Sequence, residues 1–413
     1  MFSRLVVTTL AALTLSACHH GASNGAPDLA ESPDLSPVYP ALAAPDVPQV
    51  VNAGGPVLLS PQVVVVTFDG DDSTAQIESF VGTLGATDYW AATTAEYGVG
   101  ALSVYRTIHI PATEPAPATI TDKEIQGWLS VKLDPASMSG WPQPSTQTIY
   151  AIFYPATTSI TQGADAGAPR SCESFGGYHS DTGITTGTQR IVYAVLPRCT
   201  DPQLGTFGYL TAATSHELIE ASTDPYPNTN PAYSTVDASH FVWARFLGGG
   251  ETGDMCAQEP TANFKREGFD YYVQRSWSNA AAAAGKSPCV PALDAPAYFD
   301  ASPTTAPGPI TLSFMGFSFE TAGFAIPIGT SQTIGFQLYS DGATDPITIS
   351  AADVSGSALS LSWDSTTGVN GDTLHLTLTA NQATNGRGGI DAIAITTKVG
   401  TTSHYWLGVV QSQ

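Results

Sequence analysis

Residues 210–225, LTAATSHELIEASTDP, predict the helix around which we expect the N-terminal half of the chain to be built. The stretch has no Gly or Pro before its last residue, and that proline ends the helix because the residue before a proline is pushed out of the α region. Positions four apart lie on one helix face, so His216 and Glu220 point the same way. Asp224 joins this face at the C-terminal end, and Glu217 lies about 100° further round the helix.

This layout resembles the zinc-protease helix H-E-x-x-H, with Glu in place of the second His. An imidazole and a carboxylate both bind Zn²⁺, which makes His216 and Glu220 an acceptable pair of ligands. A carboxylate that lies near the metal without binding it can take a proton from water, and Glu217 has that position. The alternative interpretation is that both glutamates are solvated and that His216 caps a packed helix.

A third ligand has to come from elsewhere in the chain, and the loop at residues 248–256 (GGGETGDMC) is the main candidate. Its glycines give the backbone freedom to aim two carboxylates inwards, so we expect Glu251 or Asp254 to bind the metal. The alternative is a tight surface turn held by Cys256. His179, which follows two glycines, is another candidate on what we expect to be a loop.

Residues 1–18 have the pattern of an export signal, with a basic residue followed by an apolar core at 5–15 that is too short to span a membrane. The pattern ends in Leu-Ser-Ala-Cys, which resembles the bacterial lipoprotein box. We therefore expect Cys18 to be acylated. Because His19 and not Asp follows it, the resemblance implies sorting to the outer membrane. A plain secretory signal with a chance Cys is the alternative, and no later segment is apolar enough to span a bilayer.

Four further cysteines predict two disulfides, because an even count is typical of exported proteins. Three pairings are open. We prefer the sequential one, in which each bond brackets one compact segment, so that Cys172 pairs with Cys199 and Cys256 with Cys289. A cysteine metal site is less favoured, since no C-x-x-C spacing occurs.

The chain of 413 residues has 36 acidic and 14 basic residues, a formal net charge of −22. Repulsion therefore disfavours nucleic acid and anionic membrane surfaces as partners, and we expect contact with a membrane through the N-terminal lipid alone. Charged residues make up only 12%, with 39 Gly and 30 Pro, which is typical of a turn-rich extracellular protein. Its length predicts two domains.

Residues 19–51 are rich in Ala, Pro, Ser and Asp, and we expect a disordered tether. Residues 52–290 then alternate between strand and helix patterns, which predicts an α/β (α+β) domain with a central sheet beside the helix described above. The expected strands are 57–69, 102–110, 148–154, 190–196 and 271–277, and the expected helices are 73–84, 89–97 and 121–133.

Residues 291–413 have a different character. Seven short stretches of alternating polarity are separated by Gly, Asp, Asn and Ser turns, which predicts an immunoglobulin-like β-sandwich. It contains no cysteine, and nothing in it indicates catalysis, so we expect a binding or spacer module. The seven expected strands are 311–314, 333–339, 347–350, 359–363, 374–379, 392–397 and 405–410.

Several motifs follow one another in a fixed order: GGPV at 54–57, AEYGVG at 95–100, GYH at 177–179, TDP at 223–225, GETGDMC at 250–256 and WSN at 277–279. This set resembles the bacterial relatives of the phosphate-induced protein 1, or Exordium-like, family of exported proteins, over residues 52–290. The family has no settled biochemical activity, and its plant members, which are associated with the cell wall and growth, lack the His-Glu pair. The bacterial pattern resembles a metallopeptidase site, and we carry over only His216, Glu217, Glu220, Glu251 and Asp254.

These patterns favour an exported, lipid-anchored, zinc-dependent hydrolase, most simply a peptidase, with Glu217 as general base. The competing hypothesis is a non-catalytic surface protein that binds polysaccharide or peptide. A third hypothesis keeps the ion but makes it Ca²⁺, because carboxylates on a Gly-rich loop suit a hard cation.

Overall fold

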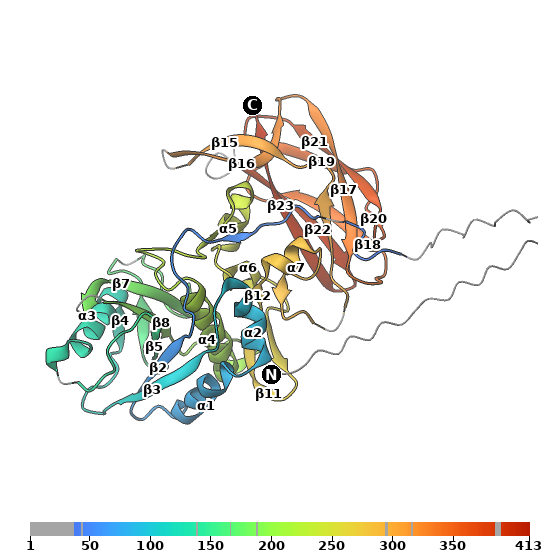
Figure 1. Cartoon of the computed structure of the whole chain (residues 1–413). Helices are drawn as coiled ribbons and strands as arrows, with labels where there is room; N and C mark the ends of the chain where they lie inside the picture. The colour runs from blue at the N-terminus through green and yellow to red at the C-terminus, as the bar shows by residue number, and fades with distance from the viewer. Residues whose placement is uncertain are drawn as a thin grey trace, which may run out of the picture. The chain divides into compact units, whose positions relative to one another are not determined.

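The computed structural model describes residues 37–413 except 43, 138, 166, 187–188, 294–295, 315–316 and 385–389 (Figure 1). The export signal, Cys18 and most of the expected tether lie outside the described residues. Strands outnumber helices in the described part, and most neighbouring strands run antiparallel.

A five-stranded sheet, ordered β3-β2-β5-β8-β7, forms the centre of the N-terminal part. The first four strands run parallel, and β7 is added antiparallel at one edge. Their bounds are β2 Gln62–Phe68, β3 Ser103–Ile110, β5 Thr148–Phe153, β7 Tyr178–Thr186 and β8 Gln189–Leu196.

Both faces of this sheet are covered, which explains the unbroken run of valines in β2. Val63 and Val65 face the helices α1 (Thr74–Leu84) and α4 (Gly205–Thr223). Val64 and Val66 face the opposite side, where α3 (Asp122–Lys132) packs. A strand that is buried on two faces cannot alternate polar and apolar residues. Each fully buried valine contributes about 1.5 kcal/mol or more to folding.

The expected elements of this part are present, with four differences. The strand expected at 271–277 is two strands, Phe269–Gln274 and Ser276–Trp277, and neither belongs to the five-stranded sheet. The strand expected at 57–69 begins at Gln62, because Pro61 before it has no N–H to donate to a ladder. Helix α4 begins five residues earlier than the expected stretch, at Gly205. Residues 178–186, which we expected to be part of a loop, form the edge strand β7. The helix expected from residue 121 is present, and Thr121 and Glu124 form a capping box at its start.

Smaller elements complete the N-terminal part. Three short antiparallel pairs are β1 with β9, β10 with β11 and β12 with β13, and β4 pairs with β6 in parallel. Their bounds and those of the short helices are β1 Val50–Val51, α2 Asp88–Thr94, η1 Ala95–Tyr97, β4 Thr119–Thr121, η2 Pro135–Ser137, β6 Ser159–Thr161, β9 Thr235–Val236, η3 Ala238–His240, α5 Phe241–Leu247, α6 Asp254–Ala257, β10 Asn263–Arg266, β11 Phe269–Gln274, β12 Ser276–Trp277, α7 Asn279–Ala283 and β13 Cys289–Val290.

The structured chain starts before the expected boundary at residue 52. Val50 pairs with Val236 and is buried, and the backbone carbonyl of Asp46 accepts a hydrogen bond of 2.8 Å from the Trp406 indole. A disordered tether therefore cannot extend as far as residue 51. The alternation of apolar residues in this segment is too short to be recognised without its partner strand.

The C-terminal part consists of two sheets with apolar side chains between them, as expected for a β-sandwich. All seven expected strands are present, and β14, β16 and the short β20 are additional. One sheet has the order β14-β17-β21-β19 and the other β15-β16-β23-β22-β18-β20. The bounds are β14 Phe299–Pro303, β15 Gly308–Phe314, β16 Phe317–Ile326, β17 Ser331–Ser340, β18 Ile347–Asp353, β19 Leu359–Trp363, β20 Thr367–Gly368, β21 Thr373–Ala380, β22 Asp391–Val399 and β23 Thr402–Ser412.

Both predicted disulfides are confirmed. Cys172 is bonded to Cys199, and Cys256 to Cys289, with sequence separations of 27 and 33 residues. The first bond joins the segment before β7 to the segment after β8. The second holds α6 against β13.

Candidate metal centre

The C-terminal half of α4 is buried, and it carries the acidic and imidazole side chains of the candidate site. Glu217 and Glu220 are only 5% and 2% exposed, so little water surrounds their charges. The Nε2 atom of His216 lies 3.0 Å from Oε2 of Glu220, one helical turn along, as the spacing predicted. A buried carboxylate needs hydrogen bonds or a positive charge, because burial without them costs several kcal/mol.

The glycine-rich loop reaches this helix and binds to Glu220. Oε1 of Glu220 accepts hydrogen bonds from the backbone N–H groups of Gly253 and Asp254, each at 3.1 Å. A Cβ atom at Gly253 would lie 2.8 Å from both Glu220 Oε1 and His216 Nδ1. A side chain is therefore excluded at this position, and the loop can carry Asp254 into the site only because residue 253 is glycine.

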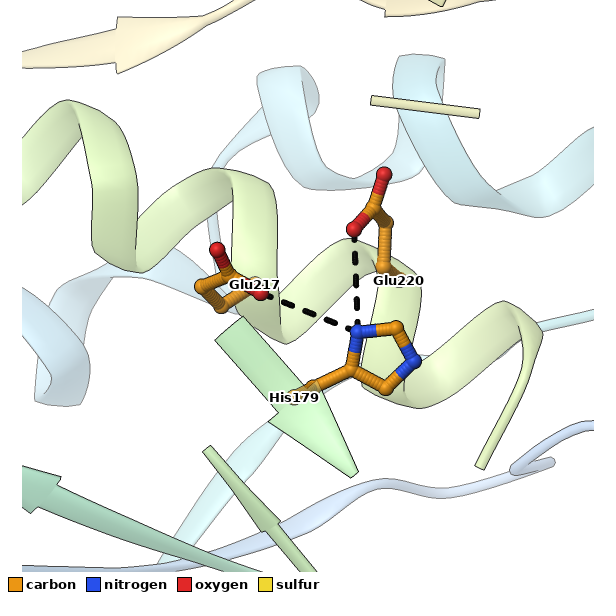
Figure 2. A group of neighbouring side chains, drawn as sticks. All are labelled: His179, Glu217 and Glu220. Carbon is orange, nitrogen blue, oxygen red and sulfur yellow. Dashed lines mark ion pairs between the residues drawn. The ribbon is translucent and has the colours of Figure 1, made fainter. Parts of the chain in front are cut away.

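His179 approaches the same carboxylates from β7 (Figure 2). Its Nδ1 atom lies 3.7 Å from Oε2 of Glu217 and 3.6 Å from Oε2 of Glu220. Its Nε2 atom lies 3.1 Å from the backbone carbonyl oxygen of Asp224 and 3.6 Å from Oε1 of Glu251. A carbonyl oxygen can only accept, so Nε2 carries a proton and donates it to Asp224.

These side chains form two groups of ligand atoms that share Glu220. One group is His216, Glu220 and Asp254, and the other is His179, Glu217 and Glu220; within each group the ligand atoms lie within 4.8 Å of one another. Zinc bonds of about 2.0–2.1 Å place the ligands of a tetrahedral site about 3.3 Å apart. The separations of 3.0 Å from His216 to Glu220 and 3.8 Å from His216 to Asp254 bracket that value. The donor set therefore fits a divalent ion such as zinc.

The charges of the site act on one another, so that the pKa values of its two histidines and of Asp254 are raised and that of Glu220 is lowered. Burial alone would lower the pKa of His216 and of His179, but the neighbouring carboxylates raise both well above the usual value. Burial raises the pKa of Glu220, but the two histidines outweigh it and hold that pKa below its usual range. Burial and the charge of Glu220 raise the pKa of Asp254 to about 7.

Glu251 and Asp224 are two further acids of the site, and the pKa of each is raised. Burial and three neighbouring carboxylates raise the pKa of Glu251 well above its usual value, against the attraction of His179. Burial also raises the pKa of Asp224. Its Oδ1 atom accepts a hydrogen bond of 2.6 Å from the Ala232 N–H, whereas its buried Oδ2 atom has no hydrogen-bond donor among the described residues. The site thus contains more buried acid than its two histidines can neutralise.

A cavity of about 790 Å³ opens onto these residues. Its lining includes six carboxylate residues and, among the described residues, no lysine or arginine. Tyr209 and the disulfide between Cys172 and Cys199 form part of its wall. The cavity therefore attracts cations and is large enough for an extended substrate segment.

All five residues expected in the site converge there: His216, Glu217, Glu220, Glu251 and Asp254. Asp254 starts the short helix α6 and not a free loop. Two further acids of this part of the chain lie elsewhere: Asp237 pairs with His240, and Glu259 lies beside His404. His179 also belongs to the site, although its only signal in the sequence was the Gly-Gly pair two residues before it. Gly177 is needed there, since a Cβ atom would lie 2.9 Å from the Glu217 carboxylate.

No protein-family model matches the chain, and no curated protein matches it either. Solved structures match only segments of it. A conjugative transposon lipoprotein from Bacteroides eggerthii DSM 20697 is 15% identical, with 27% of this chain and 95% of that chain covered and a TM-score of 0.18. Domains 4 and 5 of the S-layer protein SbsC are 14% identical, covering 27% of this chain and 48% of that one, with a TM-score of 0.17. A chimeric titin Z1Z2 is 8% identical, covering 29% and 98%, also with a TM-score of 0.17. Similarities this low do not bear on the fold or the function.

Among the described residues, no helix combines the length and the apolar composition that crossing a bilayer requires.

Proposed function

We propose that this protein is a zinc-dependent hydrolase whose catalytic ion is held by His216, Glu220 and Asp254, and that its substrates are peptides. The observation that supports this most is the convergence of an imidazole and two carboxylates, from α4 and the glycine-rich loop, at separations of 3.0 and 3.8 Å. This group is more accessible than the other one. The side chains of His216 and Asp254 are 13% and 30% exposed, and a catalytic zinc needs an open position for water or substrate.

An ion at this place would act as a Lewis acid on a substrate carbonyl and lower the pKa of water. Glu217 is adjacent to His216 but belongs to the other group of ligand atoms, so its carboxylate is available as a general base. In this role it removes a proton from the attacking water and passes it to the leaving amine. Positioned bases of this kind contribute about 10²- to 10⁴-fold to a rate.

The ligand types favour zinc over calcium. Carboxylates and the Asp224 carbonyl would suit Ca²⁺, which takes six to eight oxygen ligands. The imidazole of His216 among only three side-chain ligands instead favours a borderline metal such as zinc. The calcium hypothesis and the non-catalytic binding hypothesis remain the alternatives that an experiment has to separate.

The localisation and the family resemblance belong to the same proposal. Acylation at Cys18 would tether the hydrolase to the cell envelope, in agreement with two disulfides in the folded part, which are typical of exported proteins. The Exordium-like resemblance over residues 52–290 and an immunoglobulin-like fold for the sandwich are further proposals.

Metal content and peptide hydrolysis of the purified protein test the proposal directly. We expect the wild type to bind zinc and to cleave a peptide library, and we expect His216→Ala to lose both. The matched control is His109→Ala, which removes an exposed histidine that also pairs with a glutamate, Glu78, at 2.6 Å. Stoichiometric calcium would favour the calcium hypothesis. A wild type that neither binds metal nor cleaves peptide would favour the hypothesis of a non-catalytic binding protein.

A further inference from the structure

The group formed by His179, Glu217 and Glu220 has the attributes of a cation site of its own. Its three side chains come from β7 and α4 and are only 3%, 6% and 3% exposed (Figure 2). The proposed catalytic ion does not use His179 or Glu217. The two histidines belong to different groups, so one ion does not reach both in this geometry.

The hydrogen bond to Asp224 decides which nitrogen of His179 can bind an ion. Its Nε2–H donates to the Asp224 carbonyl, which leaves Nδ1 as the atom for a ligand bond. Nδ1 faces Oε2 of Glu217 and Oε2 of Glu220, and an ion that binds among these three atoms takes the place of a proton on Nδ1. Histidines that bind metals usually anchor their other ring nitrogen to a carbonyl or carboxylate in this way.

We propose that His179, Glu217 and Glu220 form a second, weaker zinc site, and that its occupation inhibits hydrolysis by binding the general base. This inference rests on the proposed function for the first ion and for the role of Glu217. When the oxygens of Glu217 bind an ion, they no longer accept a proton from water. The hydrolase is then active with one zinc ion and inhibited by an excess of zinc.

Two features make the second site weaker and non-catalytic. Both ions would share Glu220, and two doubly charged ions separated by one carboxylate repel each other. The second site is also less exposed than the first, since none of its side chains is more than 6% exposed, whereas His216 and Asp254 are 13% and 30% exposed. A less exposed ion leaves less room for a water molecule and a substrate carbonyl together, and an open position is what distinguishes catalytic from structural zinc sites.

A zinc titration of the whole purified protein tests this proposal, with zinc chloride as the probe and with calorimetry and peptide hydrolysis as readouts. We expect two binding steps and a maximum of activity after the first. In His179→Gln, whose amide can still donate to Asp224, the second step should weaken by about tenfold or more. The fall in activity at excess zinc should disappear with it. The matched control His109→Gln should keep both steps and the inhibition.

Glu217→Gln provides a second test that does not depend on the folding of the His179 variant. It removes a ligand of the second site only, so calorimetry should show the first binding step without the second. A wild type that binds one zinc ion and hydrolyses peptide without inhibition would overturn the second site and leave the proposed function standing. Two full binding steps in both variants would also overturn it, and a wild type without any zinc would contradict both proposals.

Discussion

Buried carboxylates occur in the α/β part and in the sandwich, but their surroundings differ. In the sandwich, Asp300 is 3% exposed and accepts hydrogen bonds from the Tyr298 hydroxyl, the Ala301 N–H and the Thr397 hydroxyl, at 3.2, 2.8 and 3.1 Å. Burial raises the pKa of Asp300 to about 6. Neutral donors and the nearby His404 therefore offset part of the cost of burying this acid.

In the cleft of the α/β part, the buried acids instead lie beside one another. Glu217 and Glu220 face two histidines and the further acids Glu251 and Asp254. Elsewhere in the same part, the buried Asp71 is matched by Arg198, which makes two contacts with it at 2.6 and 3.3 Å. The cleft thus places several buried acids beside one another, which indicates a place for a cation rather than a structural ion pair.

The largest expected effect is on catalysis, and it should follow from the loss of a carboxylate in the cleft but not of one elsewhere. Glu217→Gln should lower kcat/KM by about 10²- to 10⁴-fold, because the amide cannot accept the proton, while the first zinc ion stays bound. Steady-state kinetics and zinc analysis of the same preparation measure both. Glu78→Gln, at a partly exposed His–Glu pair, is the control and should keep its activity. Loss of the first zinc ion from the Glu217 variant would make Glu217 a ligand of that ion and not a base.

Breaking the matched ion pair should affect stability and not the cleft. Arg198→Met leaves Asp71, whose side chain is 2% exposed, without its partner. We expect a loss of about 3–5 kcal/mol in the free energy of unfolding, measured by urea denaturation. The exposed pair of Arg170 and Glu173, at 3.9 Å, supplies the control: Arg170→Met should change stability by less than about 1 kcal/mol. Equal effects of the two variants would mean that burial does not make one ion pair more important for stability than the other.

Loss of the disulfide at the glycine-rich loop should lower both the stability of the fold and the affinity of the cleft for zinc. Replacing Cys256 and Cys289 by serine opens a loop closed over 33 residues, which corresponds to about 3–4 kcal/mol of stability. Zinc affinity should fall as well, because Cys256 lies in the same short helix as Asp254. The pair of Cys172 and Cys199 is the comparison, with a similar loss of stability expected. Unchanged zinc affinity in the first double variant would show that Glu220 alone positions the loop.

The cluster of His240, Asp237 and Asp46 offers a pH-dependent test. His240 lies 2.9 Å from Asp237 and 3.3 Å from Asp46, and these carboxylates outweigh the effect of burial and raise the pKa of His240 to about 9. Its contribution to stability is full below the ordinary value of 6.5 and is lost as the pH rises through about 9. Thermal unfolding from pH 6 to pH 10 should show a decline of a few kcal/mol at most, which His240→Gln flattens. An identical pH profile for the variant would contradict the assignment.

The smallest expected effect concerns the acid of the sandwich. Asp300→Asn keeps a polar side chain and removes the charge, so the free energy of unfolding at pH 8 should stay within about 1 kcal/mol or rise. The corresponding change in the cleft, Glu220→Gln, should instead remove zinc. Denaturation and metal analysis of the two variants test the contrast. A strong destabilisation by Asp300→Asn would mean that the sandwich also depends on a charged carboxylate.

Short-range patterns determined a large part of this protein by themselves. The continuous apolar run of β2, the helix start at Thr121 and the one-turn spacing of His216 and Glu220 depend only on side-chain type and local backbone geometry. The sequential disulfide pairing was also correct, because each bond closes a short segment. The same local signals could not reveal β7, whose polar residues form a strand only beside β8.

The tertiary structure alone decided how the site is composed. His179 reaches Glu217 and Glu220 because β7 pairs antiparallel with β8 at the edge of the sheet against which α4 packs, an arrangement that no local pattern encodes. The division of Glu251 and Asp254 between the two histidines depends likewise on where the glycine-rich loop meets α4. Side-chain chemistry and spacing along a helix are properties of the sequence, whereas contacts between segments distant in the chain depend on the packing of the whole domain.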